Sequence, residues 1–272
     1  MDAFLSFFEQ MPTWQKFVWI LICLSFHWIL EAGFPLFTFG YKKWRHAGVN
    51  FVFLGCSMLI NLIFGLATVA IFGWMAEHEF GLLYLVELPT WLELLIALIL
   101  LDFAAQYVVH YLLHRVKWMW KLHMVHHSDT KVDATTGTRH HPGDYLLREV
   151  FALGMILITG IPLAFYLFYR ILTIFFAYFT HANIHMPYWL DKALSYVIIT
   201  PNMHKFHHHF ERPWTDTNFG NIFSIWDRIF GTMVYDDPQK IIYGLDVLDS
   251  NTDENVGYQF KIPFDKSIKT DY

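Results

Sequence analysis

Histidines are concentrated in one part of this chain, and their spacing constrains the fold more than any other sequence feature. Thirteen of the 16 histidines lie between residues 110 and 209. Ten of them form four clusters: His110 and His114; His123, His126 and His127; His181 and His185; His204, His207 and His208. Residues four apart on a helix share one face, so each cluster can bind a metal ion through two imidazoles. The fold must therefore bring four separate clusters to one place.

The composition indicates an integral membrane protein. Of the 272 residues, 55% are hydrophobic, 19% aromatic and 16% charged, whereas a soluble domain has about 25% charged residues. The mean hydropathy is +0.33. The net charge of −5 and the lack of a long basic run argue against a nucleic-acid partner. Cys23 and Cys56 lie in apolar stretches and give neither a disulfide framework nor a cysteine metal site.

Four apolar regions are predicted to enter the membrane: 17–37, 50–76, 91–114 and 146–180. The first three are long enough for the roughly 20 residues that a bilayer requires. No basic segment precedes the first region, so we expect an uncleaved anchor rather than a signal peptide.

Local signals refine the last two regions. Thr90 with Glu93 three residues later resembles a capping box at the start of the third. Gly160 and Pro162 interrupt the fourth, and proline breaks a helix. We therefore expect two half-length helices in the fourth region, forming a hairpin that returns to the side it left.

The charges of the loops predict the orientation. Loops 40–49 and 115–121 carry lysine and arginine, whereas the loop after the second span carries Glu77, Glu79 and Glu87 and no basic residue. Basic loops favour the cytoplasmic side. The N-terminus is then outside, and all four histidine clusters lie on the cytoplasmic face.

The third span carries a polar stripe formed by Asp102, Gln106, His110 and His114, each four residues apart. Such side chains cannot face lipid without a large cost, so the stripe must face the protein interior or a cavity. Ten imidazoles would serve two ions with about five ligands each and leave a position for water, O2 or substrate. A structural zinc needs only four ligands.

Imidazole suits zinc, copper, iron and nickel, so the residues leave the metal open. Two ions bound by neutral ligands carry a large positive charge, which carboxylates would partly offset. Asp102, Asp129, Asp144 and Asp227 are candidates to hold the N–H groups of the ligands in place.

The four clusters, in this order, resemble the histidine boxes of the fatty acid hydroxylase/sterol desaturase superfamily of integral membrane di-iron oxidases. The segments TGTRHHP (136–142) and NFGNIFSIWDRIFGT (218–232) are similar to motifs that flank the boxes in that family. The resemblance covers about 95–235. It implies an all-α membrane protein of about four transmembrane helices, the last a broken hairpin, capped by a cytosolic helical lobe that holds the metals.

The resemblance also implies a site, carried over position by position. The ligands are the ten clustered histidines, bound to two Fe2+ ions that zinc can replace after overexpression. His141 occupies the family's H-P position and is expected beside the ligands rather than on the metal. Gln106, which belongs to the polar stripe of the third span, is expected beside the ligands as well. Asp144 stands where the family commonly has an acidic residue. The boundaries are then 1–90 for two spans, 91–235 for the catalytic domain and 236–272 for a polar tail.

The chemistry implied is O2-dependent hydroxylation of an unactivated C–H bond in a membrane lipid such as a fatty acyl chain, a sterol or an ether lipid. The chain has no dinucleotide-binding motif and no cysteine-ligated cluster, so the electrons must come from a separate cytochrome b5-like or ferredoxin-like donor. HPGD (141–144) resembles a haem-binding motif, but too few residues separate the neighbouring spans for a haem domain.

Several alternatives stay open. Desaturation on the same scaffold, a zinc-dependent membrane hydrolase and a non-catalytic metal-binding protein all fit the boxes. His140 and His209 neighbour the boxes and are ambiguous as ligands. The intramembrane pair His27 and Glu31 has a functional or a structural role, and Arg170 is expected to pair with Glu31 or Asp102 or to extend to the membrane surface.

Overall fold

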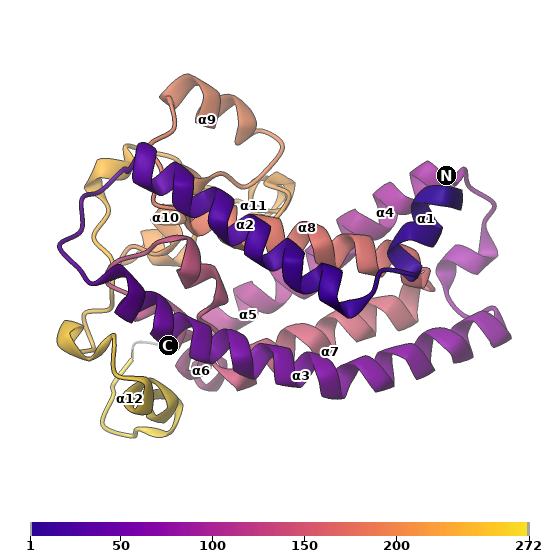
Figure 1. Cartoon of the computed structure of the whole chain (residues 1–272), viewed down its shortest axis with the longest axis horizontal. Coiled ribbons are helices and arrows are strands. Elements are labelled where there is room, and N and C mark those ends of the chain that lie inside the picture. Colours follow the sequence, from indigo (N-terminus) through magenta and orange to yellow (C-terminus); the bar gives the residue numbers. More distant parts are fainter. Residues whose placement is uncertain (1, 271–272) are drawn as a thin grey trace.

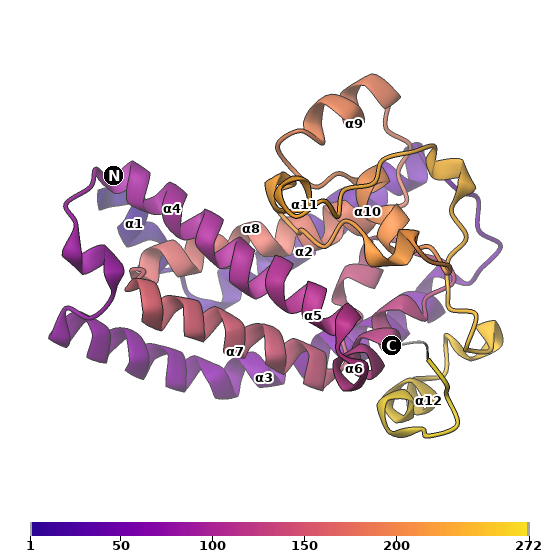
Figure 2. The same cartoon turned by 180° about the vertical axis from the view of Figure 1, so that it is seen from behind.

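The computed structural model describes residues 2–270, and within them the chain is helical with no strand. The long helices run side by side, and the short helices α9 to α12 lie toward the end of the bundle opposite the N-terminus, where the short α1 lies (Figures 1 and 2). The helices are α1 (Asp2–Glu9), α2 (Thr13–Gly33), α3 (Lys43–His78), α4 (Thr90–Asp102), α5 (Val109–Arg115), α6 (Lys117–His127), α7 (Pro142–Thr159), α8 (Leu163–His181), α9 (Tyr188–Leu194), α10 (Pro201–His207), α11 (Ile225–Ile229) and α12 (Val256–Lys261).

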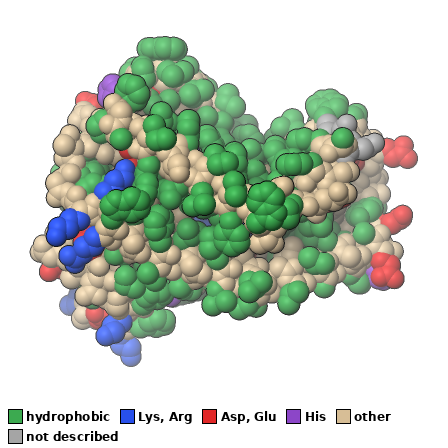
Figure 3. All heavy atoms as spheres, in the orientation of Figure 1, with side chains coloured by type: hydrophobic (Ala, Val, Ile, Leu, Met, Phe, Trp, Pro, Cys, Tyr) green, Lys and Arg blue, Asp and Glu red, His purple; other side chains and the backbone are tan. Residues whose placement is uncertain are grey.

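Four helical segments are long and apolar enough to cross a membrane: Thr13–Gly33, Lys43–Leu85, Thr90–Arg115 and Leu163–His181. Large apolar side chains cover their outer surface, and Leu66 is 80% exposed (Figure 3). Such an apolar exterior needs lipid around it. Buried apolar side chains of α3, α4, α7 and α8 form the interior of the bundle. The predicted multi-pass all-α membrane fold is confirmed.

The third span is not one continuous α-helix. A π-helical segment, Phe103–Val108, separates α4 from α5. A π turn adds a residue to the helical repeat and rotates everything after it. The continuous polar stripe predicted from Asp102 to His114 is therefore interrupted. The predicted capping box is not formed either, because Thr90 already lies inside the helix and Pro89 occupies the cap.

The fourth apolar region is a hairpin, but its arms are longer than predicted. α7 has 18 residues and α8 has 19, about 27–28 Å each at 1.5 Å per residue. Each arm is therefore close to the thickness of a bilayer rather than half of it. Gly160 makes the turn with φ of +73°, and a Cβ there would lie 2.9 Å from the carbonyl oxygen of Phe80.

The charged residues of the spans have definite partners. Arg170 pairs with Glu149 of α7 at 2.5 Å rather than with Glu31 or Asp102. Glu31 pairs with Lys43 at 2.9 Å and also accepts hydrogen bonds from two backbone amides of the histidine-rich lobe. His27 donates its Nδ1 hydrogen to the carbonyl of Cys23 and lies outside the histidine clusters.

The polar segment after residue 235 packs on the histidine-rich lobe. Ile262 and Ile268 join Trp120 and Met124 of α6 in one buried cluster. The guanidinium of the buried Arg139 donates to the carbonyl of Asp253. The polar composition of this segment reflects its outer surface and not an absence of packing.

The charges lie at the two ends of the bundle. Lysine and arginine side chains gather at the end that carries the histidine-rich lobe, and the opposite end is acidic (Figure 3). This distribution agrees with the loop charges in the sequence. Which end faces the cytoplasm stays a prediction.

Candidate metal centre

Nine of the ten predicted ligands lie in two adjoining groups of buried imidazoles. Within each group the available ring nitrogens all lie within 4.8 Å of one another. The first group consists of His110, His114, His123, His127 and His207, and the second of His126, His181, His204 and His208. Helices α5, α6, α8 and α10 converge to bring them together, and ring centroids of His127 and His208 are 4.7 Å apart across the two groups.

Hydrogen bonds fix the orientation of four of these rings. His110, His181 and His207 donate their Nδ1 hydrogens to backbone carbonyls at 2.8, 2.7 and 2.8 Å. His123 donates its Nδ1 hydrogen to Asp144 at 2.7 Å. These oxygens can only accept, so the proton is on Nδ1 and the lone pair is on Nε2. This tautomer is the one a metal ligand bound through Nε2 requires.

The Nε2 atoms then face one another. Those of His110 and His123 are 2.9 Å apart, and Nε2 of His181 lies 3.1 Å from those of His126 and His204. Neither His110 nor His123 has a hydrogen at Nε2, so their lone pairs repel unless a cation lies between them. With metal–nitrogen bonds of about 2.1 Å, ligands at a right angle are about 3.0 Å apart, against about 3.4 Å for a tetrahedral arrangement. The spacing fits nitrogens that share one bound ion.

The remaining nitrogens support the same assignment. Both ring nitrogens of His127 and His208, and Nε2 of His114 and His207, are buried without a hydrogen-bond partner among the described residues. A buried polar atom without a partner costs about 1–3 kcal/mol. Metal ligation can satisfy one nitrogen of each of these four rings, so the residues present fit a pair of bound ions.

Burial keeps the imidazoles neutral. Desolvation, reinforced by the neighbouring imidazoles, holds the pKa values of His126, His127, His204, His207 and His208 well below their usual range. Desolvation also lowers the pKa of His123 to about 3, against the opposing effect of Asp144. Neutral imidazole is the form that binds a metal ion.

The structure corrects the prediction for His185. α8 ends at His181, and the chain continues in an extended conformation. The backbone amide of His185 donates to the carbonyl of Phe34 at 2.7 Å, and its side chain is exposed, away from both groups. The four-residue spacing of His181 and His185 therefore does not place them on one helix face.

Asp144 is the carboxylate that contacts the centre most directly. One oxygen accepts from His123 at 2.7 Å and from His140 at 3.1 Å, and the other accepts from Arg148 at 2.9 Å. Gln106 contacts Arg148 at 3.1 Å instead of a ligand. Gln106 and Arg148 therefore hold Asp144, which in turn holds His123.

The roles predicted for other residues are corrected. Asp102 and Asp227 accept hydrogen bonds from backbone amides of the loop 219–223 rather than from histidine rings. They act indirectly, because a carbonyl of that loop accepts the Nδ1 hydrogen of His110. Burial raises the pKa of Asp227 to about 6.

Two further predicted positions also lie away from the rings. His141 accepts from the amide of Gly143 at 3.1 Å and caps α7. Asp129 binds His46 and Thr136, neither of which belongs to the two groups.

Sequence reasoning missed one contact and left two histidines undecided. Oδ1 of Asp216 lies 3.3 Å from Nδ1 of His114. The two residues are 102 positions apart in the sequence, and no sequence pattern indicated the contact. His140 stacks on His126 with ring centroids 4.5 Å apart and forms a third group with His123 and Asp144. His209 accepts from a backbone amide at 3.0 Å and lies outside the groups.

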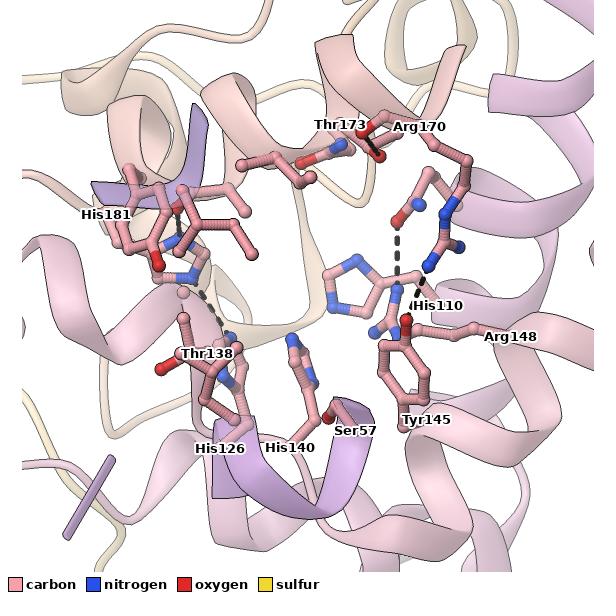
Figure 4. A pocket seen from close by; sticks show the side chains of 18 of the residues that line it. Ser57, His110, His126, Thr138, His140, Tyr145, Arg148, Arg170, Thr173 and His181 are labelled. Atoms are coloured by element: carbon pink, nitrogen blue, oxygen red, sulfur yellow. Dashed lines mark hydrogen bonds between the residues drawn. The ribbon is translucent and has the colours of Figure 1, made fainter. Parts of the chain in front are cut away.

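A cavity of about 190 Å³ joins the histidines to the interior of the spans. His110, His126, His140 and His181 line it, as Figure 4 shows. Apolar side chains of α2, α3 and α8 form another part of its wall: Ile20, Leu54, Met58, Ile174 and Ala177. The cavity therefore has imidazoles on one part of its wall and apolar side chains on another.

Comparison with known families assigns the chain. The model of the family described as fatty acid hydroxylase matches residues 94–232, just over half of the chain. The chain belongs to the fatty acid hydroxylase family. This places it in the superfamily that the histidine boxes resemble, and the matched segment contains every histidine of both groups.

Several known proteins are similar to the chain. An ornithine lipid hydroxylase of Rhizobium tropici is 30% identical over 146 residues, which are 53% of this chain and 42% of the relative. Human alkylglycerol monooxygenase is 28% identical over 154 residues, 57% of this chain and 33% of the relative. A cholesterol 25-hydroxylase-like protein of Danio rerio is 25% identical over 227 residues, 80% of this chain and 88% of the relative.

The chain thus matches less than half the length of the first two of these relatives. No solved structure matches it.

Proposed function

We propose that this fatty acid hydroxylase family member is a di-iron monooxygenase that hydroxylates an unactivated C–H bond of a membrane lipid, such as a fatty acyl chain, a sterol or an ether lipid. The proteins to which the chain is similar are named as hydroxylases and monooxygenases. The observation that carries the proposal is the single cavity that joins both imidazole groups to an apolar wall within the spans.

The residues of the chain have distinct tasks in this reaction. When bound, the two irons supply the activation of O2 and the oxidising power for C–H attack, which no side chain provides. The nine histidines hold the metals, and the carbonyl and carboxylate acceptors at Nδ1 keep the rings in the required tautomer. The apolar wall binds the lipid chain and excludes water from the reacting carbon.

The electron donor is proposed to be a separate cytochrome b5-like or ferredoxin-like protein that docks on the histidine-rich lobe. The basic side chains at this end of the bundle support a cytoplasmic location for the lobe (Figure 3). The segment 91–235 is proposed as the catalytic domain, with the two spans of 1–90 as its membrane support and 236–272 packed onto it.

The test is lipidomics of cells that express the wild type, His126→Ala or His209→Ala under isotopically labelled O2. We expect the wild type and His209→Ala to produce a lipid that has gained one labelled oxygen, and His126→Ala to produce none. His209 is a matched control because it lies beside the boxes but outside both groups.

Other outcomes separate the alternatives. Loss of two hydrogens without gain of oxygen would identify a desaturase. Turnover of a lipid without O2 or reductant would refute the oxidase and favour a zinc-dependent hydrolase. Unchanged lipids in all three cultures would contradict catalysis. Metal analysis of the purified protein is expected to find two irons per chain, or zinc in their place after overexpression.

A further inference from the structure

A cluster of polar side chains lies inside the membrane-spanning bundle and shares the cavity with the metal-site histidines. It consists of Asn61 of α3, Tyr145 and Glu149 of α7 and Arg170 of α8, and all four line the cavity. Polar and charged side chains within a membrane are costly and mark functional sites by default. Its hydrogen bonds and ion pairs with the other described residues include none to the nine histidines, so the cluster is not needed to hold a metal.

Some hydrogen-bond donors of the cluster have no acceptor within it. Arg170 donates from Nη2 to Asn61 at 3.1 Å and to Tyr145 at 2.5 Å, and from Nη1 to Glu149 at 2.5 Å. Asn61 donates from Nδ2 to the same Tyr145 oxygen at 2.7 Å. A guanidinium and an amide NH2 cannot accept, so the Tyr145 hydroxyl accepts twice and its own hydrogen has no acceptor among the described residues.

Arg170 has spare donors as well. Three of its five N–H groups are used by these bonds, which leaves two. Its side chain stays 26% accessible although it is paired, because it faces the cavity. Figure 4 shows Arg170 and Tyr145 on one side of the cavity and His126, His140 and His181 on the other. The space between them is bounded by donors at one end and metal-binding rings at the other.

The charge and size of the site limit what fits there. Glu149 neutralises the charge of Arg170. An anionic ligand would have to compete with Glu149 for the guanidinium, and a cationic ligand would be repelled by it. A neutral oxygen that accepts hydrogen bonds is the complementary group. The cavity of about 190 Å³ holds on the order of ten water-sized groups. The oxygen that the cluster binds and the carbon that reacts must therefore be separated by no more than about ten non-hydrogen atoms of the ligand.

We propose that the cluster of Asn61, Tyr145, Glu149 and Arg170 binds an uncharged oxygen of the lipid substrate and thereby sets which carbon reaches the metals. The substrate is then a lipid with a hydroxyl, ether or ester oxygen close to the oxidised carbon, not a plain hydrocarbon chain. This inference rests on the proposed function, because it concerns the substrate of that reaction. A binding measurement tests it without turnover.

The experiment measures binding of four probes to the detergent-purified full chain without reductant: hexadecanol, its methyl ether, methyl palmitate and heptadecane. Native mass spectrometry or ligand-induced thermal stabilisation gives the affinities. We expect at least one oxygen-bearing probe to bind about tenfold more tightly than heptadecane, the difference expected of one or two hydrogen bonds. The order of the three probes identifies the kind of oxygen.

Two variants separate recognition from helix packing. Tyr145→Phe removes the unpaired donor and is expected to reduce the tenfold preference to about twofold or less. Tyr166→Phe is the matched control, because Tyr166 contacts Glu149 at 3.4 Å but does not line the cavity. It is expected to keep the preference. Equal binding of all four probes by the wild type, or an equal loss in both variants, would overturn the inference.

Turnover with O2 and reductant separates this inference from the proposed function. Wild-type protein that prefers an oxygen-bearing probe but hydroxylates none supports the binding site and contradicts the function. Wild-type protein that hydroxylates lipids without any preference for oxygen supports the function and contradicts the binding site. If the wild type shows both the binding preference and hydroxylation, Tyr145→Phe is expected to hydroxylate several carbons of the lipid. Tyr166→Phe is expected to hydroxylate the same carbon as the wild type.

Discussion

Replacement of Asp144 by asparagine tests how the histidine-rich lobe holds its metals. Both oxygens of this fully buried carboxylate accept hydrogen bonds, one from His123 at 2.7 Å and His140 at 3.1 Å, the other from Arg148 at 2.9 Å. The amide of Asp144→Asn must present its NH2 to one of these donors. Arg148 cannot lose its proton, whereas an imidazole can move its proton to the other nitrogen. The NH2 therefore faces His123.

The consequence falls on the metal ligand. To accept from the new NH2, His123 must carry its proton on Nε2, the nitrogen that lies 2.9 Å from Nε2 of His110. That nitrogen can then no longer bind a metal. Loss of such a supporting partner typically lowers metal affinity 10- to 100-fold, about 1.4–2.7 kcal/mol. We expect a loss of this size in the first group.

The assay is chelator competition with metal quantification by mass spectrometry on purified, monodisperse protein. Asp129→Asn is the control, because Asp129 is equally buried and bonds to His46, which is not a ligand. We expect the control to retain wild-type metal affinity per folded molecule. Unchanged affinity in Asp144→Asn, or equal losses in both variants, would refute the reasoning from tautomers.

Three further predictions follow from particular residues. His185→Ala is expected to keep the metal content of the wild type, whereas His181→Ala loses metal, and metal analysis of both variants checks this. Gly160→Ala is expected to cost about 1–3 kcal/mol of stability because φ is +73°; Gly154→Ala, with open space around it, should be neutral or slightly stabilising in thermal unfolding. In metal-free protein the folded pKa of His123 is about 3, below its usual value of about 6.5. Between these pH values the unfolded chain binds a proton that the folded chain does not, so acid lowers the free energy of unfolding by about 1.4 kcal/mol per pH unit for this group alone. Thermal unfolding of chelated protein between pH 7.5 and 5 should therefore show a falling midpoint, and a flat profile would contradict this.

The sequence predicted those parts of the site that depend on regular helices. His110 and His114 lie one turn apart on α5, and His123 and His127 lie one turn apart on α6, so their spacing alone placed each pair on one face. The apolar windows predicted the spans for a similar reason, because a bilayer selects length and hydropathy directly. Asp144 was one of four carboxylates predicted to hold ligand N–H groups, and it stands where the resembling family commonly has an acidic residue.

What the sequence could not predict depends on where helices end and on how distant loops return. His185 has the same spacing from His181 as His114 from His110, but α8 ends at His181 and the spacing loses its meaning. Nothing local signals the π turn that interrupts the stripe below His110. Asp216 reaches His114 only because a loop after α10 folds back over α5.

Glu31 shows why a costly charge is kept at the end of a span. It is 5% exposed and joins three segments: it pairs with Lys43 at 2.9 Å, and one oxygen accepts from the amides of Ala134 at 2.7 Å and Asn183 at 2.9 Å. Ala134 begins the turn after α6, and Asn183 follows His181 by two residues. One carboxylate thus connects α2 to the turn that follows α6 and to the segment that follows α8. The position of the imidazole groups relative to the spans is therefore set in part by a contact that the spans themselves make.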